Sequence, residues 1–310
     1  MLSVLFVPLW ASGFIAGKIA TGYLDVPAVL FWRFLIALVV MLGVALVARP
    51  ALPHGRAWLH LAVTALLLQV GQFTCVYTGL AAGVPAGLSS LILGMAPLLV
   101  GLLTPLLLRT KLGVAPVLGL LIGAAGVYVV LSDELGGGVG AAVVFPVLGM
   151  ASLTAGTLYQ KRFNDDTPVV TSVVVQMATS LVATLVAWPF LGAHWLPSSG
   201  GGWLAVGWLG IFNSAGAFAL MFLLLRLRDT VHVSALLNLI PATTALAAVP
   251  VLGEPLTAQA VLGLVIALVG MYVGIGRLGR RRKPTAATGS DPDTTANADG
   301  TPRLQARPRT

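Results

Sequence analysis

The sequence predicts an all-α membrane protein in which ten transmembrane helices form two inverted five-helix repeats. Three observations support this prediction. Hydrophobic residues make up 57% of the 310-residue chain and charged residues only 9%, whereas a soluble domain carries about 25% charged residues. Apolar runs of membrane-spanning length follow one another along the chain, and one long segment occurs twice. Most of the surface of this protein is therefore expected to face lipid.

Gly, Pro and charged residues divide the chain into ten apolar segments, each near the ~20 residues that a helix needs to cross a bilayer. The N-terminal segment lacks the basic start of a secretory signal, so we expect it to be the first span. Prolines in the fourth and ninth segments are expected to bend those helices. The expected spans are residues 2–20, 27–48, 57–81, 84–108, 112–131, 141–162, 167–191, 202–226, 230–252 and 256–276.

Basic residues predict the orientation of these spans, because cytoplasmic loops are enriched in Lys and Arg. One set of alternate loops contains eight basic residues and the other set contains none. Eight more lie in the segment 277–310, on the same side as the first set. We therefore expect a multi-pass protein of the inner (cell) membrane, with both termini cytoplasmic and a disordered basic tail at 277–310 that contacts membrane lipid. Under this interpretation the net charge of +8 orients the protein and does not indicate a nucleic-acid partner.

The segment at 107–130 recurs at 251–274 with an offset of 144 residues, and ten of the 24 positions are identical. The same offset aligns Gln69 with Asn213, and farther upstream an offset of 143 aligns Lys18 with Lys161. The repeats are therefore residues 1–131 and 141–276, joined by a linker at 132–140. Each repeat has an odd number of spans, so the second must cross the membrane in the opposite direction. Inverted repeats of this kind let a central site open to either side of the membrane, as transporters require.

Several apolar motifs follow one another in a defined order: PLWASGFIAGKIA at 8–20, FWRFLIA at 31–37, SSLILGMAPLLVGLLTPLLL at 89–108, and ALLNLIPATTALAAVPVLGEPLT at 235–257. In this order and spacing, residues 3–276 resemble the EamA-type branch of the drug/metabolite transporter superfamily. The resemblance implies two EamA repeats that export or exchange small metabolites, often amino acids, or drug-like compounds. The family often carries LGE at the end of both the fourth and the ninth helix. Here Glu254 is present, but its counterpart is Thr110, flanked by Arg109 and Lys111.

Polar side chains inside the spans are costly in hydrocarbon, so they are the candidates for substrate binding. Arg33 is expected to attract a substrate carboxylate or phosphate, with snorkelling to the interface as the alternative. Gln69 and Asn213 occupy equivalent places in the two repeats and are expected to hold a polar ligand from both sides. Hydrogen bonding between helices is the alternative role for such amides. The remaining candidates for substrate binding are Trp10, Gln72, Tyr77, Ser90, Ser234 and Asn238.

None of the ten acidic residues is expected in the middle of a span, which favours facilitated transport or exchange over proton coupling. No metal-binding spacing, nucleotide-binding loop or catalytic constellation is present in the sequence, so we expect no cofactor, no metal and no enzyme activity. Two alternatives remain open at this point. One is a nucleotide-sugar or phosphate-ester exchanger in which Arg33 and Lys18 hold the anion. The other is a membrane-embedded enzyme or a non-transporting scaffold. The sequence leaves the oligomeric state open.

Overall fold

Helices form nearly all of the chain that the structure describes, and no strand occurs within that part. The computed structural model describes residues 2–107, 109, 113–134, 139–163, 167–187, 195–217, 220 and 236–276. The first half contains α1 (Leu2–Thr21), α2 (Val26–Ala48), α3 (Ala57–Ala65), η1 (Leu66–Gly71), α4 (Gln72–Ala81), α5 (Ala86–Gly94), α6 (Ala96–Leu107) and α7 (Val114–Glu134). The second half contains η3 (Gly140–Val143), α8 (Val144–Phe163), α9 (Val169–Ala187), α10 (Gly200–Trp208), η5 (Leu209–Gly216), α13 (Ile240–Leu252) and α14 (Ala258–Gly276).

The lengths of these helices confirm a multi-pass, all-helical membrane protein. Shorter apolar helices occur at Leu5–Thr21, Ile240–Leu252 and Ala258–Gly274, where the first, ninth and tenth spans are expected. The eighth expected span is described through α10 and η5, and the tail at 277–310 lies outside the described residues. The count of ten spans therefore stays a prediction. Six helices among the described residues are long and apolar enough to cross a membrane, namely Val26–Ala48, Ala57–Ala81, Ala86–Leu107, Val114–Ser132, Gly140–Phe163 and Val169–Ala187.

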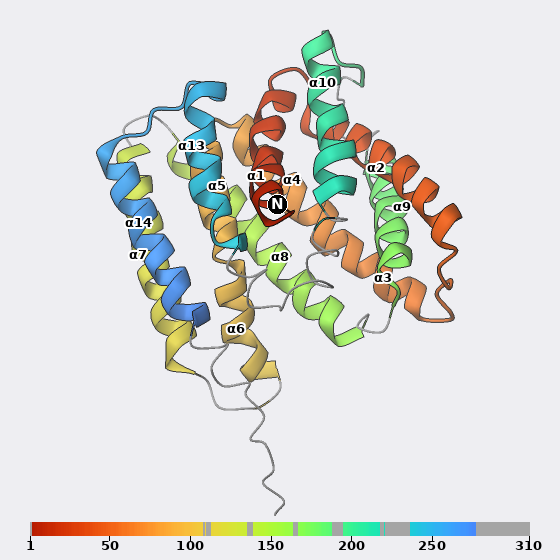
Figure 1. The fold of residues 1–310 in the computed structure, drawn as a ribbon, viewed down its shortest axis with the longest axis horizontal. Helices are drawn as coiled ribbons and strands as arrows, with labels where there is room; N and C mark the ends of the chain where they lie inside the picture. Colours follow the sequence, from red (N-terminus) through yellow and green to blue (C-terminus); the bar gives the residue numbers. More distant parts are fainter. Residues whose placement is uncertain are drawn as a thin grey trace, which may run out of the picture.

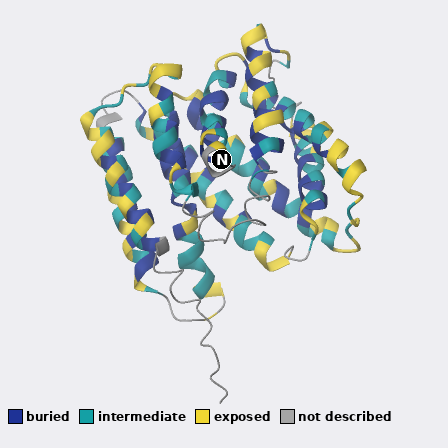
Figure 2. Ribbon diagram, viewed as in Figure 1, coloured by how far each residue is buried: buried dark blue, intermediate teal, exposed yellow. Residues whose placement is uncertain are grey.

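The outward faces of the helices carry large apolar side chains. Val47 is 87% exposed, and Leu46, Leu204 and Tyr272 are each 77% exposed. Figure 2 shows that exposed residues run along the outer sides of the helices, including α7 and α14. An apolar surface of this extent is unfavourable in water and is the surface that hydrocarbon solvates.

Two helices contain a π-helical turn at equivalent places in the two repeats. The third expected span runs from α3 through η1 to α4, and the eighth runs from α10 into η5. The offset of 144 places Gln69 of η1 over Asn213 of η5. A π turn widens the helix locally, and such turns are frequent at functional sites. The repeat has therefore retained an unusual backbone feature together with the amide that it carries.

The fourth span is broken at Met95, between α5 and α6. Pro97 lies in the first turn of α6, and its counterpart Pro241 lies in the first turn of α13. The missing N–H of proline costs little there, because N–H groups of a first helical turn have no partner within the helix. These two prolines therefore begin helical segments, whereas Pro105 and Pro250 lie inside α6 and α13.

The helices α7 and α14 lie side by side (Figure 1) and are joined through glycine. A Cβ atom at Gly126 would lie 2.6 Å from the carbonyl oxygen of Gly263, and one at Gly119 would lie 2.7 Å from that of Gly270. Residue numbers rise along α7 as they fall along α14, so the two helices are antiparallel. The offset of 144 converts the first contact pair into the second. The helices α7 and α14 are thus related by a local two-fold axis, as the inverted arrangement predicts.

The turns between α1 and α2, between α4 and α5 and between α13 and α14 lie at one end of the bundle, the upper end in Figure 1. We call this the outer end, following the predicted orientation. The opposite end, where α6 and α14 finish, is called the inner end.

We expect Gly126→Leu to destabilise the protein, because the added side chain would meet the backbone of α14. Overpacking of this kind costs about 1–3 kcal/mol, which lowers a melting temperature by several degrees. The measurement is thermal unfolding in detergent, followed by tryptophan fluorescence and by loss of the monodisperse peak on size exclusion. Gly43→Leu is the matched control, since a Cβ atom there meets nothing within 4 Å. Equal melting temperatures of the two variants would contradict the proposed tight packing.

Candidate functional site

The most deeply buried charge among the described residues belongs to Arg33 of α2, whose side chain is 1% exposed. Its Nη1 donates a hydrogen bond to the hydroxyl of Tyr77, and its Nη2 donates to Oδ1 of Asn213 at 3.0 Å. The guanidinium carbon lies 3.7 Å from the ring centre of Phe73, which is cation–π geometry. We call Arg33, Phe73, Tyr77 and Asn213 the Arg33 cluster. It joins the first half of the chain to the second.

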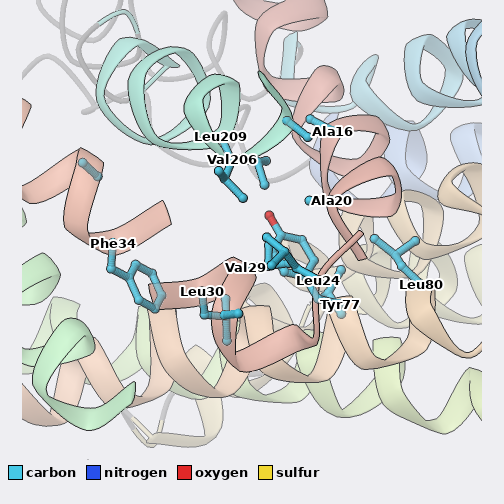
Figure 3. Packing of buried hydrophobic residues seen from close by; sticks show 14 of the residues in the cluster. Ala16, Ala20, Leu24, Val29, Leu30, Phe34, Tyr77, Leu80, Val206 and Leu209 are labelled. Carbon is cyan, nitrogen blue, oxygen red and sulfur yellow. The ribbon is translucent and has the colours of Figure 1, made fainter. Parts of the chain in front are cut away.

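The two aromatic residues of the cluster come from one face of α4. Phe73 and Tyr77 are spaced i, i+4, which places their side chains next to each other on a helix, and their ring centres are 5.8 Å apart. Gly17 of α1 makes room for Tyr77, because a Cβ atom there would lie 2.6 Å from Cε1 of the phenol ring. Figure 3 shows the Tyr77 ring among apolar side chains, including Ala20, with its hydroxyl on the side of Val206.

The amide of Asn213 is held in one orientation by the backbone of α1. Its Nδ2 donates to the carbonyl oxygens of Leu9 and Trp10, both at 3.3 Å. Gly13 lies against the same amide and leaves no space for a side chain of its own. Because both donors of Asn213 point toward α1, its oxygen is the atom that faces Arg33.

The charge of Arg33 is not balanced by an acid in the described part of the chain. Its hydrogen-bond partners there are a phenol and an amide, both neutral, and its Nε has no partner. A buried cation without a counter-ion is costly inside a membrane and marks a functional position by default. A carboxylate would neutralise the charge and accept from the guanidinium in charge-assisted hydrogen bonds. The cluster therefore has the chemistry of an anion-binding site.

Gln69, the repeat counterpart of Asn213, lies in a second buried polar group. It is 4% exposed, and its Nε2 donates to Oε1 of Gln176 on α9 across 3.5 Å. Gln176 in turn donates to the hydroxyl of Ser172 at 2.9 Å. The oxygen Oε1 of Gln69 has no partner. Each of the two amides thus contacts the second helix of the opposite half, Gln69 on α9 and Asn213 on α2, and they do not bond each other.

Trp10 and Gln72 lie beside these two groups. Trp10 is half-buried and packs on Phe6 with ring centres 5.5 Å apart. Its carbonyl oxygen accepts a hydrogen bond from Asn213 of the Arg33 cluster. Gln72 is half-buried at the start of α4, between Gln69 and Phe73. Both positions remain predictions for substrate contact.

Three further candidates are not brought to the Arg33 cluster by any described contact. Ser90 is buried, and its hydroxyl donates to the carbonyl oxygen of Gly87 on its own helix at 2.8 Å. Asn238 is half-buried in the turn that precedes α13. Ser234 lies outside the described residues.

Two contacts of the structure were not anticipated by the sequence-based predictions. Phe73 stacks on Arg33, and the available signal was its i, i+4 spacing from Tyr77. Lys18 forms an ion pair with Glu254, with Nζ and Oε1 separated by 2.7 Å. The available signal there was that both residues were expected near the same end of the membrane.

Two inverted repeats of membrane-spanning helices that meet at a buried polar cluster define a multi-pass membrane protein of the transporter class. The chain belongs to the EamA-like transporter family, whose sequence profile matches residues 1–132 and 140–275. The resemblance noted from the motifs is thereby confirmed, and the protein is a membrane transporter of EamA type.

Several named proteins are similar to this chain over most of its length. A probable amino-acid metabolite efflux pump of Salmonella typhimurium is 26% identical over 290 residues, which cover 88% of this chain and 93% of the relative. An uncharacterized transporter of Bacillus subtilis is 28% identical over 279 residues, covering 86% of this chain and 88% of the relative. A crystal structure of a protein with 20% sequence identity superposes with a TM-score of 0.65 and covers 91% of this chain and 98% of that one. The last similarity supports the fold alone.

We expect Tyr77→Phe to destabilise the protein, because it removes a hydrogen bond to a buried charge, worth about 1.5–3 kcal/mol. Adding Arg33→Met to Tyr77→Phe should cost less than the sum of the two single changes, since the charge that needed the phenol is gone. Thermal unfolding of the four proteins in detergent measures this coupling. Tyr23→Phe, at an exposed tyrosine of the outer end, is the matched control. Strictly additive effects would show that the phenol and the guanidinium are not energetically coupled.

Proposed function

We propose that this transporter exports or exchanges small metabolites, such as amino acids or drug-like compounds that carry a carboxylate, by alternating access around the Arg33 cluster. The observation that carries the proposal is the buried and uncompensated charge of Arg33, held between helices of both halves. The protein is proposed to act in the cell membrane with both termini in the cytoplasm, because that orientation places the basic loops inside.

The contact between Arg33 and Asn213 supports the alternating-access mechanism. It joins α2 of one half to η5 of the other, and the substrate carboxylate would bind beside it at the free Nε. Rocking of one half against the other would change this contact and open the site toward one side at a time. The substrate would then be bound by Arg33 in both states, while its neighbours from the second half change.

The name of the relative from Salmonella typhimurium, a probable amino-acid metabolite efflux pump, supports the same substrate class and the export direction. An amino acid offers one carboxylate, which one guanidinium can hold in a two-point contact. Its ammonium group would need an acceptor, and the free Oε1 of buried Gln69 is the candidate.

The phosphate-ester alternative is less well supported. That hypothesis required Arg33 and Lys18 to hold the anion. Lys18 is paired with Glu254 and also donates to the carbonyl oxygen of Val84 at 3.2 Å, so its charge is balanced. The alternatives of an enzyme or a scaffold gain no support from the relatives, which are named transporters and efflux pumps.

Counterflow in proteoliposomes tests the proposal. Vesicles loaded with an unlabelled amino acid should take up the labelled one, and a panel of amino acids and drug-like compounds identifies the preferred substrate. Arg33→Gln should lower uptake at least tenfold, the effect of losing a charge-assisted contact of about 1.5–3 kcal/mol. Lys161→Gln, at an exposed lysine of α8, is the control and should transport like the wild type.

The variants at Asn213 separate charge from packing. Asn213→Asp would supply Arg33 with a counter-ion and compete with the substrate carboxylate, so it should reduce uptake more than Asn213→Ala. Gln69→Ala should weaken binding of amino acids more than binding of simple carboxylates, which lack the ammonium group. If no compound moves under any gradient, transport is wrong. If Arg33→Gln transports normally, the assigned site is wrong.

We also expect transport to be facilitated or exchange-driven. Glu254 lies in the turn between α13 and α14. Within the described part of the chain, the hydrogen bonds of Arg33 go to Tyr77 and Asn213 and not to a carboxylate. Imposing a pH gradient on the vesicles should therefore leave the final accumulation of substrate unchanged. Accumulation that follows the proton gradient, and is lost when one acid is neutralised, would contradict this expectation.

A further inference from the structure

We propose that Lys18, Glu254 and the backbone amide of Ala86 form an ionic latch that holds the two halves together at the outer end. The inverted repeat does not supply the acid of this latch a second time in the sequence, because the counterpart of Glu254 is Thr110. The latch is therefore inferred to make the outward-closed conformation the resting state of the transporter. This inference rests on the proposed alternating access, in which the two ends close in turn.

The latch connects three elements. Lys18 lies near the end of α1, and its Nζ contacts Oε1 of Glu254 at 2.7 Å and the carbonyl oxygen of Val84 at 3.2 Å. The carboxylate of Glu254 accepts from the N–H of Ala86 through both of its oxygens, at 2.9 and 3.1 Å. Lys18, Val84 and Ala86 belong to the first half and Glu254 to the second, so these hydrogen bonds of the Glu254 carboxylate all cross between the halves.

Two features of the structure around Glu254 attract its carboxylate. Ala86 is the first residue of α5, where the free N–H groups and the helix dipole attract an anion. The side chains of Lys18 and Glu254 are 24% and 13% exposed, so water screens their attraction only in part. The pair is consequently more than a surface ion pair, which contributes little to stability.

The packing around the latch is tight. The partly open cavity lined by Pro85, Leu91 and Glu254 has a volume of only about 40 Å³, so it holds little more than a few water molecules. Gly87 of α5 lies against Ala245 of α13, where a Cβ atom would be 3.3 Å from the Cα of Ala245. The two halves are thus in direct contact next to the ion pair, through α5 and α13.

The repeat shows that this latch is one-sided. In an inverted-repeat transporter, a contact that closes one end has its counterpart, made by the equivalent residues, at the other end. The counterpart of Lys18 is Lys161, and that of Glu254 is Thr110, between Arg109 and Lys111. The sequence therefore replaces the acid of the outer pair by a neutral residue with two cations beside it.

Two hydrogen bonds cross between the halves at the inner end in the described part of the chain. Nδ1 of His60 lies 2.8 Å from the hydroxyl of Tyr159, and the hydroxyl of Thr171 donates to the carbonyl oxygen of Ala51 at 2.8 Å. An ion pair at one end and hydrogen bonds at the other favour closure at the end that carries the ion pair. Opening outward then requires breaking the latch, which the substrate-bound form must achieve.

The test uses a reporter cysteine beneath the latch. Cys75 is the only cysteine of the chain, so Cys75→Ser gives a background in which Leu91→Cys can be labelled alone. Leu91 is 1% exposed and lines the small cavity beside Glu254. The rate of labelling by a charged maleimide, measured in nanodiscs without substrate, reports how often the outer end opens.

We expect Lys18→Gln and Glu254→Gln each to raise the labelling rate about tenfold, the effect of a change of roughly one to two kcal/mol in the closing equilibrium. Lys161→Gln, the repeat counterpart without an acidic partner, should leave the rate unchanged. Unchanged rates in folded Lys18→Gln and Glu254→Gln would overturn the latch, as would an equal rise in Lys161→Gln.

A second measurement avoids variants that fail to fold. In the protein with only the reporter cysteine, about 1 M NaCl shortens the screening length to ~3 Å and should raise the labelling rate, while a labelled cysteine at exposed Ala82 should react at a constant rate. No response to salt would overturn the latch. Because neither measurement needs a substrate, failure of counterflow would reject the proposed function and leave the ionic closure standing. Normal counterflow with unresponsive labelling would reject only the latch.

Discussion

Hydrocarbon offers no hydrogen bonds, so a polar group between the ends of the helices must find its partner inside the protein. The guanidinium of Arg33 makes the strongest demand of this kind, and the centre of the bundle is arranged around it. Phe73 and Tyr77 supply an aromatic face and a hydroxyl from one side of α4. The π-helical segment η5 supplies the oxygen of Asn213. The glycines of α1 are needed because the phenol and the amide occupy the space of their side chains.

The two-fold relation between the halves is closer in the backbone than in the chemistry. The glycine contacts between α7 and α14 and the π turns η1 and η5 occur in both repeats. The charge of Arg33 and the acid of Glu254 each occur in one repeat only. In the other repeat α9 presents the neutral Gln176 to Gln69, and Thr110 stands at the position of Glu254. Backbone symmetry allows two conformations of similar construction. The charges that lack a counterpart then make the two conformations differ: Arg33 is proposed to bind an anion, and Glu254 is proposed to close the outer end.

Much of the candidate site could be predicted from the cost of polar groups in a membrane. That cost alone selected Arg33, Gln69 and Asn213, and all three are buried and hydrogen-bonded. It could not separate substrate contacts from structural ones: Ser90 satisfies its hydroxyl on its own helix, which the sequence does not distinguish from a ligand contact. It also treated Lys18 as a free cation, because the turn that carries Glu254 is 236 residues away and reaches it only when the halves pack.

The sequence by itself determined the membrane environment, the number of repeats and their opposite orientation. Hydrophobic length, loop charge and internal identity each follow from the order of residues along the chain, so no knowledge of packing was required. The tertiary structure decided which polar groups meet. The bond of Arg33 to Asn213 and that of Lys18 to Glu254 both cross between the halves. Asn213 lies in the π-helical segment η5, which the spacing of apolar residues does not reveal. Pairing across the repeat is a property of the assembled bundle, because only there do the two halves share one low-dielectric interior.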